Sequence, residues 1–509
     1  MKKIFTFIVG GKAGQGVRRA GTVAAHLFAQ MGRNAFQMDD YQSLIRGGHN
    51  FSVVSTSLDE ISSQYMKADL VVNLDARSYE IHKGNLSENG VMVCDSRVKG
   101  GLTLPIMSEA KKYPKSDLIS GVSSIAVLAA AIGMKREELV DLIKKGYPRG
   151  VENNIAYATA IYDIAYPELG GKFSLEKGEK KKPLLTGNEA IALGAAAAGL
   201  DIYFAYPMTP SSSILHFLAA HTELKVVAVH PENEIAVANM AIGAAFAGAR
   251  SMVGSSGGGF ALMQEAFSLA GMVEAPVLFY LGSRPGPSTG VPTYSEQGDL
   301  RFALNQGHGE FPSIVASPGT VEEAFYLTSQ MIALVWHFQI PGILLTEKHM
   351  AESRKTVDID VEKTDWAEPL MHFNGEYKRY LDTPNGVSPL LFPSSDQLIK
   401  WNSYEHDELG ISTEDPEMIA KMHDKRRKKF DAIVEHLKKM HTVNVYGEGP
   451  ISIFTYGSTT MGVLEAVRFG DIKARVVQPI YLEPFPIWEL EKYADEKNSA
   501  VEQGMGHFA

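Results

Sequence analysis

The chain has 509 residues, a length that predicts two to four domains. Hydrophobic residues make up 45% of it and charged residues 21%, which is typical of globular proteins and excludes predominant disorder. The formal net charge is -10 with no long basic face, and no apolar run is long enough to cross a bilayer. We therefore expect neither a nucleic-acid nor a membrane partner.

Cys94 is the single cysteine. It excludes disulfides within the chain and an iron–sulfur cluster held by this chain alone, because such clusters need about four thiolates. The N-terminal residues resemble a secretion signal, but their apolar part is too short, so we expect a first β-strand there. These features favour the cytoplasm as the location.

The first segment predicts an α/β domain. Lys3–Val9 has strand character, Gly10–Gly16 is a loop, Val17–Met31 has helical spacing, and Ala35–Met38 returns to strand character. This order predicts a βαβ unit.

Composition then changes along the chain and suggests further units. Residues 170–183 are charged and almost free of large apolar side chains, as in a solvated linker. Thr186–Glu189 predicts a helix cap, and Met418–Met440 predicts a long charged helix with one packed, sparsely apolar face. The expected division is an α/β domain at 1–169, a linker at 170–183, an α/β domain at 184–364, a connector at 365–441, and a C-terminal α/β domain, possibly incomplete, at 442–509.

The N-terminal loop Gly10–Gly16 lies between a predicted strand and a predicted helix, where backbone N–H groups can receive an anion. The dinucleotide-binding pattern is incomplete, because Arg19 stands where the third glycine is required. A turn without a ligand is the alternative. Further on, Arg46 beside Gly47 and Gly48 suits either an anionic group or a surface ion pair.

A second group of loops suggests one ligand crevice in the second domain. Tyr206–Pro210 follows a predicted strand, and its two prolines would hold the Thr209 hydroxyl at a fixed position. One of the serines Ser211–Ser213 is expected to cap the next helix. Gly254–Gly259 and Arg284–Pro292 also follow strand-like runs, so the three loops are expected to share a crevice.

Glu234 directly precedes the apolar run Ile235–Ala249. A carboxylate there would lose its hydration, which is costly unless another group donates a hydrogen bond to it. The alternative is that Glu232 or Glu234 only stabilises the positive end of the helix dipole.

Taken together, these motifs resemble the α subunit of 2-oxoacid:ferredoxin oxidoreductases, fused behind a γ domain in the 2-oxoglutarate-type arrangement. The resemblance implies several doubly wound α/β domains: a Rossmann-like γ domain, a domain that binds the pyrimidine of thiamine diphosphate, and a small transketolase-C-like domain. The stretches that carry it are Gly10–Gly16, Ile45–Gly48, Tyr206–Pro210, Glu232–Glu234, Gly254–Gly259, Arg284–Gly290, Glu296–Leu300 and Tyr404–Asp407.

The resemblance also implies roles for residues. Glu234 matches the glutamate that hydrogen-bonds N1′ of the thiamine aminopyrimidine, and Thr209 matches a loop residue that faces the substrate carboxylate. The other expected residues are Tyr206, Pro207, Arg284 and Tyr294 for the substrate, Gly257 and Gly258 for thiamine diphosphate, and Gly14, Gly16, Arg46 and Gly47 as a possible coenzyme A site.

The implied partners follow from what the chain lacks. It has no Gly-Asp-Gly diphosphate motif and no cysteine set. Mg²⁺ and a [4Fe-4S] cluster are therefore expected on a separate β subunit, with no metal bound by this chain, no activity of this chain alone, and a dimer of heterodimers as the assembly. The implied reaction turns a 2-oxo acid and coenzyme A into acyl-CoA and CO₂ and passes electrons to ferredoxin.

The substrate within this class stays open. Many relatives that use 2-oxoglutarate carry a basic residue before the Glu-Gln-Gly-Asp-Leu stretch, where this chain has Pro292-Thr-Tyr294. A branched, aromatic or short 2-oxo acid is then as credible as 2-oxoglutarate. The rival hypotheses are a nicotinamide-dependent dehydrogenase that uses the N-terminal loop and a non-catalytic scaffold subunit.

Overall fold

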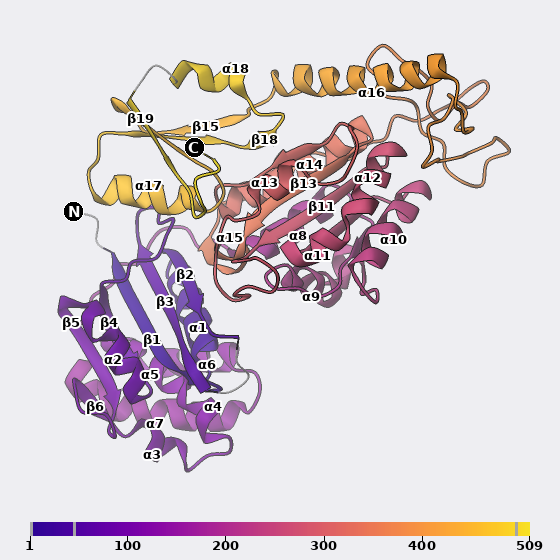
Figure 1. Ribbon diagram of the computed structural model, residues 1–509. Coiled ribbons are helices and arrows are strands. Elements are labelled where there is room, and N and C mark those ends of the chain that lie inside the picture. The colour runs from indigo at the N-terminus through magenta and orange to yellow at the C-terminus, as the bar shows by residue number, and fades with distance from the viewer. Residues whose placement is uncertain (1–3, 44–46, 494–496, 509) are drawn as a thin grey trace. The chain divides into compact units, whose positions relative to one another are not determined.

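The computed structural model describes residues 4–43, 47–493 and 497–508, and the chain divides into two compact units. One unit holds the chain up to Leu185 together with Glu352–Asp358, and the other holds Thr186–Ala351 and the chain from Ile359 onward. Figure 1 shows the course of the chain through its elements. Each unit is described by itself, and the finer five-part division stays a prediction.

The N-terminal unit is built on a mixed sheet that has eight strands among the described residues. β1 pairs in parallel with β4 and antiparallel with β3. The strands in spatial order are β6 (Leu102–Leu104), β5 (Leu86–Asp95), β4 (Ala68–Asn73), β1 (Phe5–Ala13), β3 (Gly47–Ser57), β2 (Asn34–Asp40), β14 (Arg354–Thr356) and β7 (Leu184–Thr186).

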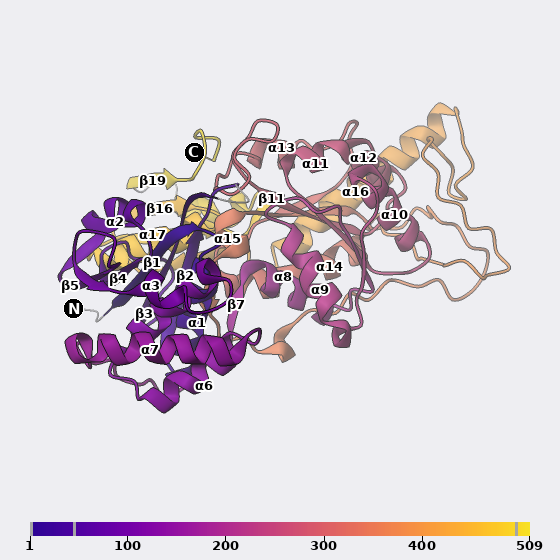
Figure 2. The ribbon, with the colours of Figure 1, turned by 90° about the horizontal axis from the view of Figure 1, so that it is seen from below.

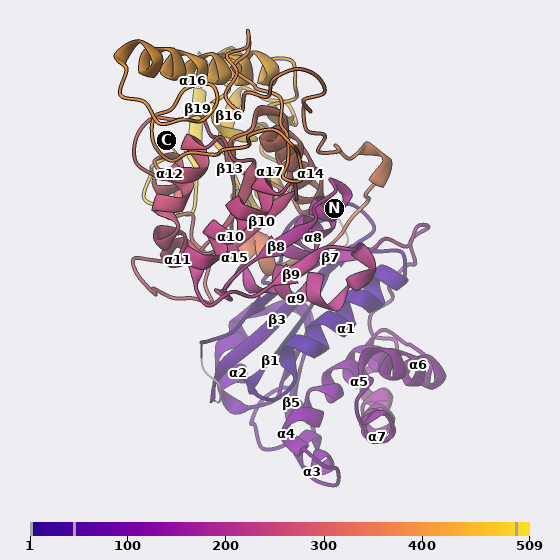
Figure 3. The same ribbon diagram turned by 90° about the vertical axis from the view of Figure 1, so that its right-hand side faces the viewer.

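Helices cover this sheet and close its core. α5 is apolar all round and buries every one of its residues, which is why it lies in the middle of the helical layer beside α7 (Figure 3). The helices of the unit are α1 (Val17–Gln30), α2 (Ala76–His82), α3 (Ile106–Ala110), α4 (Ser116–Ser120), α5 (Val122–Ala131), α6 (Arg136–Gly146) and α7 (Val151–Leu169), with a 3₁₀ turn at Lys83–Asn85.

The predicted βαβ unit is present in altered form. β1, α1 and β2 occur in the expected order, and β1 and β2 run in the same direction. They are not neighbours, because β3 pairs antiparallel with both and lies between them. The sequence reading did not include β3, whose serine- and threonine-rich run lacks the apolar character of a core strand.

The second unit holds a sheet with seven strands among the described residues, parallel except for β18. Its central strands β10, β11 and β13 are buried along their whole length, as parallel strands covered on both faces must be. The spatial order is β18 (Tyr481–Glu483), β12 (Ile314–Ala316), β13 (Pro341–Glu347), β11 (Val277–Ser283), β10 (Ser251–Ser255), β8 (Ile202–Phe204) and β9 (Val227–Val229).

Two groups of helices flank this sheet. α8 packs on α14 with α9 nearby (Figure 2), whereas α10 and α12 join the core that contains Val253 and Phe279. The helices are α8 (Gly187–Ala197), α9 (Ser212–Ala220), α10 (Glu234–Phe246), α11 (Gly257–Leu262), α12 (Gln264–Met272), α13 (Leu300–Leu304), α14 (Val321–Phe338) and α15 (Lys348–Glu352), with a 3₁₀ turn at Thr222–Leu224.

The two predicted helix caps have different outcomes. Thr186 and Glu189 form a reciprocal capping box at the start of α8, so that prediction is confirmed. The serine cap of α9 is wrong. Ser211 occupies the cap position, but its hydroxyl donates to the Met208 carbonyl, 2.8 Å away, because that carbonyl lies in the preceding turn.

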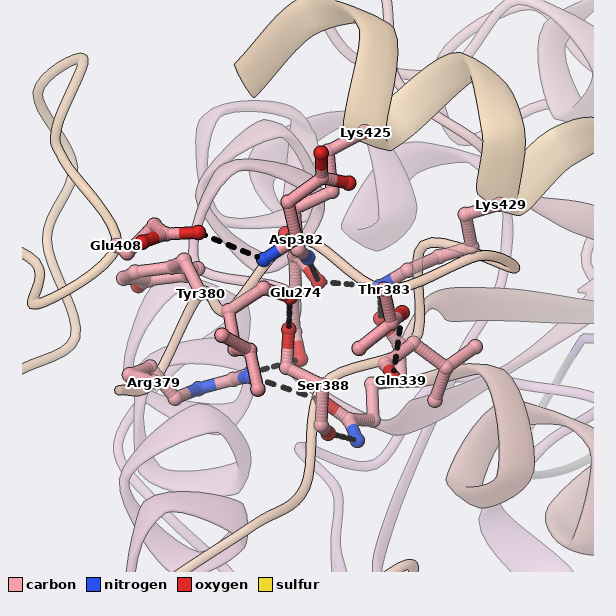
Figure 4. A network of polar contacts seen from close by, with 12 residues as sticks. Glu274, Gln339, Arg379, Tyr380, Asp382, Thr383, Ser388, Glu408, Lys425 and Lys429 are labelled. Atoms are coloured by element: carbon pink, nitrogen blue, oxygen red, sulfur yellow. Dashed lines mark hydrogen bonds and ion pairs between the residues drawn. The ribbon is translucent and has the colours of Figure 1, made fainter. Parts of the chain in front are cut away.

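The connector is fastened to this unit by its long helix α16 (Pro416–Leu437), which follows an irregular segment that begins with a 3₁₀ turn at Val361–Lys363. Lys425 and Lys429 of α16 both reach the carboxylate of buried Glu274. Arg379 donates to the Glu274 carbonyl at 2.8 Å (Figure 4). The packed face of α16 is therefore partly charged, not simply apolar as its sequence suggested.

A small C-terminal sheet completes the second unit. Its strands in spatial order are β15 (Val443–Tyr446), β17 (Arg475–Pro479), β16 (Ile451–Thr455) and β19 (Lys497–Val501), with helices α17 (Thr459–Phe469) and α18 (Ile487–Leu490) and a 3₁₀ turn at Glu491–Tyr493. Over the described ranges, none of the helices combines the length and apolar character needed to cross a membrane.

Candidate active site

The candidate site lies in the second unit, where three loops follow neighbouring parallel strands. β8 and β11 flank β10 in the sheet, and all three run in the same direction. The loops after their carboxyl ends therefore meet at one edge of the sheet, which is the usual ligand edge of an open α/β fold. These loops are Ala205–Ser211, the turn into α11, and residues 284–299, which we call the site loop.

Glu234 is the first residue of α10 and only 4% of its surface is exposed. Its atom Oε1 is buried and makes no hydrogen bond to any residue that the structure describes. Asn233 caps the helix instead, accepting a hydrogen bond from the Ala236 N–H at 3.0 Å. The carboxylate is therefore not needed for capping, and it keeps one buried oxygen for another donor.

Glycine at position 259 lets the start of α11 approach this carboxylate. A methyl group added at Gly259 would lie 2.5 Å from Glu234 Oε1 and 2.1 Å from Ser255 Oγ. Ser255 in turn contacts the Met208 sulfur at 3.9 Å. The structure thus brings together Glu234, the β10 turn and the Tyr206–Pro210 loop.

Gly257 and Gly258 differ from Gly259 in what surrounds them. A methyl group at Gly257 would lie 2.8 Å from Asp299 Oδ2, whereas at Gly258 its nearest neighbour would be the Ser288 carbonyl oxygen at 4.0 Å. Gly258 is exposed and Gly257 half-buried. The turn therefore leaves open backbone at Gly258, which faces the site loop at Ser288.

The Tyr206–Pro210 loop is held from below by buried polar side chains. Asn188 donates to the Pro210 carbonyl at 2.8 Å and to Ser213 Oγ at 2.7 Å. The Tyr280 hydroxyl donates to Asn188 Oδ1 at 2.7 Å and so fixes the amide. Sequence reasoning missed both supporting residues; Asn188 appeared only as part of the helix cap.

Arg284 connects this loop to the site loop. Its Nη1 donates to the Thr209 carbonyl at 2.8 Å, and burial lowers the pKa of its guanidinium. Asp299 accepts a hydrogen bond from Ser283 Oγ at 2.8 Å, and burial raises the pKa of its carboxyl. Thr209 and Arg284 therefore lie side by side, as expected for loops that share one site. The sequence analysis included Asp299 only within the stretch Glu296–Leu300 and gave it no role of its own.

The remaining predicted substrate residues are partly exposed to solvent. Tyr206 is 39% exposed with its ring 5.6 Å from the ring of His230, and Pro207 is half-buried. Tyr294 is 40% exposed in the site loop, where its N–H donates to the Val291 carbonyl at 3.1 Å. Both tyrosine side chains are therefore partly exposed.

The residues predicted for coenzyme A belong to the N-terminal unit. Gly14 and Gly16 adopt left-handed backbone angles, and Gly16 precedes the first residue of α1. Gly47 is also left-handed, and a methyl group there would meet nothing within 4 Å. Arg46 lies outside the described residues. These positions do not lie in the unit that contains Glu234.

Within the described ranges, no group of three or more histidine, cysteine, aspartate or glutamate side chains could hold a metal ion. Cys94 is buried in the N-terminal unit, and Asn73 donates to its sulfur at 3.7 Å.

Comparison with known families agrees with this architecture. Residues 193–425 match the model described as "Pyruvate flavodoxin/ferredoxin oxidoreductase, thiamine diP-bdg", and residues 6–164 match "Pyruvate ferredoxin/flavodoxin oxidoreductase". The first match covers the site described above, and the second covers the helices and most of the sheet of the N-terminal unit.

Individual relatives extend the similarity over the whole chain. The 2-oxoacid:ferredoxin oxidoreductase 2 α subunit of Aeropyrum pernix is 28% identical over 98% of this chain and 91% of its own length. The 2-oxoglutarate synthase subunit KorA of Archaeoglobus fulgidus is 30% identical over 62% of this chain and 86% of its own length.

A solved structure matches nearly the entire chain. The 2-oxoglutarate:ferredoxin oxidoreductase from Magnetococcus marinus superimposes with a TM-score of 0.89 at 26% identity, covering 99% of this chain and 93% of that one. The fold and the relatives together define a class of oxidoreductases. This chain belongs to the 2-oxoacid:ferredoxin oxidoreductase family and corresponds to its α subunits.

Proposed function

We propose that this chain, together with a β subunit, oxidatively decarboxylates a 2-oxo acid to acyl-CoA and CO₂ and passes the electrons to ferredoxin. The observation that carries the proposal is the buried Oε1 of Glu234, which has no hydrogen-bond partner among the described residues. A buried oxygen of this kind calls for a donor from a ligand, and the matching domain belongs to a thiamine-diphosphate-binding family.

The residues around Glu234 fit the pyrimidine half of thiamine diphosphate. Glu234 would hold the pyrimidine N1′ by a hydrogen bond and keep a proton at that nitrogen, while the open backbone of Gly258 leaves room beside it and Gly257 packs against Asp299. When bound, the cofactor supplies a carbon nucleophile and an acceptor for the electron pair left by the departing carboxylate. The apolar helix behind Glu234 keeps water from its carboxylate.

The Tyr206–Pro210 loop and Arg284 would bind and orient the 2-oxo acid. Thr209 would offer its hydroxyl to the substrate, and its carbonyl is already bound by Arg284. The Arg284 guanidinium adds a positive charge near the same place, suited to a substrate carboxylate. Tyr206, Pro207 and Tyr294 would pack against the rest of the substrate.

The surface beside the crevice supports a second subunit. Ile235 and Met240 of α10 are 52% and 45% exposed, and Leu262 at the end of α11 is 52% exposed. Exposed apolar side chains on helices that begin at a binding site are typical of a subunit interface. We propose that a β subunit binds here and brings Mg²⁺ and a [4Fe-4S] cluster, in a dimer of heterodimers.

Coenzyme A is proposed as the acyl acceptor. The M. marinus structure has 2-oxoglutarate, coenzyme A and succinyl-CoA bound, which supports this cosubstrate for a chain of the same fold. The left-handed Gly14 and Gly16 at the start of α1 offer backbone N–H groups to an anion. Gly47 would add a further backbone contact, and Arg46, outside the described residues, stays a prediction from the sequence.

The test is reconstitution with a cysteine-containing β chain, followed by reduction of methyl viologen. A panel of 2-oxo acids (2-oxoglutarate, pyruvate, branched-chain and aromatic) is assayed with and without coenzyme A. We expect reduction that depends on coenzyme A with at least one of them. No reduction with any member of the panel, in a complex that contains thiamine diphosphate and iron, would refute the proposal and favour a scaffold role.

A direct binding measurement addresses the nicotinamide alternative. Titration of NADH into the purified chain, followed by its fluorescence, is expected to give no saturable change. Saturable binding lost on substitution of Gly14 would favour the dehydrogenase hypothesis instead.

A further inference from the structure

The site loop, residues 284–299, is attached near its two ends, and between them Ser295 Oγ accepts a hydrogen bond from the His349 N–H at 3.1 Å. At the inner end Arg284 donates to the Thr209 carbonyl, and near the outer end Asp299 accepts from Ser283. Residues 286–291 are exposed. The Ser288 carbonyl oxygen lies 4.0 Å from where a methyl group on Gly258 would stand, so the exposed part of the loop passes close to the turn that is proposed to bind the cofactor.

Gln297 makes the outer attachment stronger than Asp299 alone would. Its side chain is buried, and its Oε1 accepts hydrogen bonds from the Gln503 N–H at 2.8 Å and the Thr459 hydroxyl at 2.7 Å. Its Nε2 donates to the Tyr456 carbonyl at 2.9 Å. Both polar atoms of the side chain are thus used by the small C-terminal domain.

The backbone of Gln297 is bound to the same partners. Its N–H donates to the Gln503 carbonyl at 2.8 Å, and its carbonyl accepts from the Tyr456 hydroxyl at 3.3 Å. Gln297 and Gln503 therefore pair reciprocally, backbone to backbone and backbone to side chain. No ligand is needed to explain Gln297, and its contacts run to residues more than 150 positions away.

The C-terminal tail, residues 502–508, is shaped to meet Gln297. The carboxylate of Glu502 accepts hydrogen bonds from the N–H groups of Gly506, His507 and Phe508 and folds the tail into a turn. The Phe508 ring then lies 4.9 Å from the Tyr456 ring. The tail is therefore a folded element that packs on the residues holding the site loop.

We propose that Gln297 is a positioning residue through which the C-terminal tail and the Tyr456–Thr459 turn hold the site loop closed over the bound 2-oxo acid. Gln297 itself touches neither substrate nor cofactor in this account. The part that concerns the substrate rests on the proposed function, whereas the fastening of the loop by the tail does not.

The expected consequence is a change in how often the loop is closed. If the outer attachment is lost, the loop samples open conformations. The apparent affinity for substrate is then the affinity of the closed form multiplied by the fraction of molecules in which the loop is closed. Substrate binding then closes the loop, so turnover at saturation is kept. Loss of two or three hydrogen bonds at this attachment predicts a KM for the 2-oxo acid raised about tenfold or more, with kcat within about twofold.

The first experiment needs no activity. Hydrogen–deuterium exchange of the full chain is compared among wild type, Gln297→Met, Thr459→Val, Thr459→Ser and a deletion of residues 502–509. We expect exchange of residues 285–298 to be about tenfold faster in Gln297→Met and the deletion, about threefold faster in Thr459→Val, which loses a single hydrogen bond, near wild type in Thr459→Ser, and unchanged in β10 and β11 throughout. The serine keeps the hydroxyl that bonds Gln297, so it serves as the matched control for valine.

Unchanged exchange in residues 285–298 for Thr459→Val and the tail deletion would overturn the proposal. If Gln297→Met fails to fold, these two variants still decide it, because neither alters the site loop itself. Faster exchange spread equally over the whole second unit would also overturn it, since that result would mean general destabilisation.

The second experiment uses the reconstituted complex. KM and kcat are measured for Thr459→Val and Thr459→Ser with whichever 2-oxo acid the wild type accepts. A raised KM with unchanged kcat, restored by serine, supports the proposal, while equal loss of kcat in both variants contradicts it. If the wild-type complex is inactive, the proposed function has failed, and the exchange experiment alone still tests how the loop is held.

Discussion

Glu234 Oε1 is free to meet a ligand because a neighbouring residue caps the helix in its place. Asn233 caps α10, and Gly259 allows α11 to approach the carboxylate without supplying a side chain to fill the space. A buried carboxylate oxygen without a donor is costly, and proteins retain such groups mainly where a ligand completes them. The glycine is therefore as much a part of the proposed site as the acid.

This role of Gly259 predicts a steric effect. In Gly259→Ala the new methyl group would lie 2.5 Å from Glu234 Oε1 and 2.1 Å from Ser255 Oγ, so the turn must shift. We expect a loss of about 1–3 kcal/mol in the free energy of unfolding. The control is Gly243→Ala, at an exposed position of α10 where an added methyl group would meet nothing within 4 Å. We expect it to be neutral or to stabilise by up to about 1 kcal/mol. Chemical denaturation of both variants measures the difference, and equal stabilities would contradict this packing.

A pair of buried histidines in the N-terminal unit is the second notable feature at this scale. His49 Nε2 and His82 Nε2 are 3.0 Å apart, and the Asn85 amide donates to His82 Nδ1 at 3.2 Å. Ser78 lies between His49 Nδ1 and the Asp75 carboxylate. Burial lowers the pKa of both rings, that of His82 to about 4.

The lowered pKa makes this unit sensitive to acid. The pKa of His82 is near 6.5 in the unfolded chain and about 4 in the folded one, so the unfolded chain binds more protons between pH 6.5 and pH 4. The free energy of unfolding is therefore highest above about pH 6.5 and decreases as the pH falls toward 4. From pH 7 to pH 5 we expect His82 to account for a loss of about 2 kcal/mol. Exchange of the β1 and β4 amides at both pH values measures it. His82→Gln should flatten the pH dependence, and His26→Gln, at an exposed position in α1, should not; equal slopes in all three proteins would argue against a neutral buried pair.

Single residues were predictable where a local pattern marks them. An acid before an apolar helix marked Glu234, and two prolines after a strand marked the Thr209 loop. Gln297 and Asn188 carry no such mark, because the partners that explain them are Gln503, Tyr456, Tyr280 and Pro210, all distant in sequence. Only the folded chain brings those groups together.

At the scale of elements, α16 shows how a charged helix is held. Its buried face includes Lys425 and Lys429, both bound to the carboxylate of Glu274, and Arg379 donates to the Glu274 carbonyl (Figure 4). The two lysines are four residues apart and so share one face. The sequence predicted this helix from its charge pattern but could not identify which lysines are buried, since that depends on an acid some 150 residues earlier.

Removal of the shared acid should release the connector. In Glu274→Gln the side chains of Lys425 and Lys429 lose their buried counter-charge, and we expect a destabilisation of about 3–5 kcal/mol. Lys428→Ala is the control on the same helix, because its partly exposed pair with Asp382 should contribute less than about 1 kcal/mol. Urea unfolding followed by exchange in α16 measures both; a cost for Glu274→Gln no larger than that for Lys428→Ala would refute the anchoring role.

The strand order of the N-terminal sheet could not be predicted from the sequence. Alternation of strand and helix character correctly indicated an α/β unit, but it did not reveal that β3 would lie between β1 and β2. β3 is a long strand that is rich in serine and threonine, and its polar side chains hid it from a search for apolar runs. Strand order depends on pairing between distant segments, which local pattern does not encode.

At the scale of the whole molecule, the proposed oxidative decarboxylation requires a partner chain. The apolar side chains Ile235, Met240 and Leu262 lie exposed on the helices that begin at the proposed site. The family resemblance predicted an order of domains and a β subunit, because its motifs occur in sequence order along the chain. It could not indicate which surface the partner covers.

A charge placed on this surface should prevent assembly. In Ile235→Arg a charged side chain would be buried without a partner in the complex, at a cost of several kcal/mol. We expect the variant to fold as wild type but to lose co-purification with the β chain. Ile164→Arg, at an exposed position in α7 of the N-terminal unit, is the control. Undiminished co-purification of Ile235→Arg would place the interface elsewhere.

The most direct test of the central claim measures proton exchange at C2 of the thiazolium ring in the reconstituted complex. Wild type and Glu234→Gln are loaded with thiamine diphosphate, mixed with D₂O and quenched, and the remaining C2 proton is counted by NMR. The account predicts exchange at least about a hundredfold slower in the variant, with cofactor still bound. Equal exchange rates in two fully loaded complexes would show that the Glu234 carboxyl does not act on the pyrimidine.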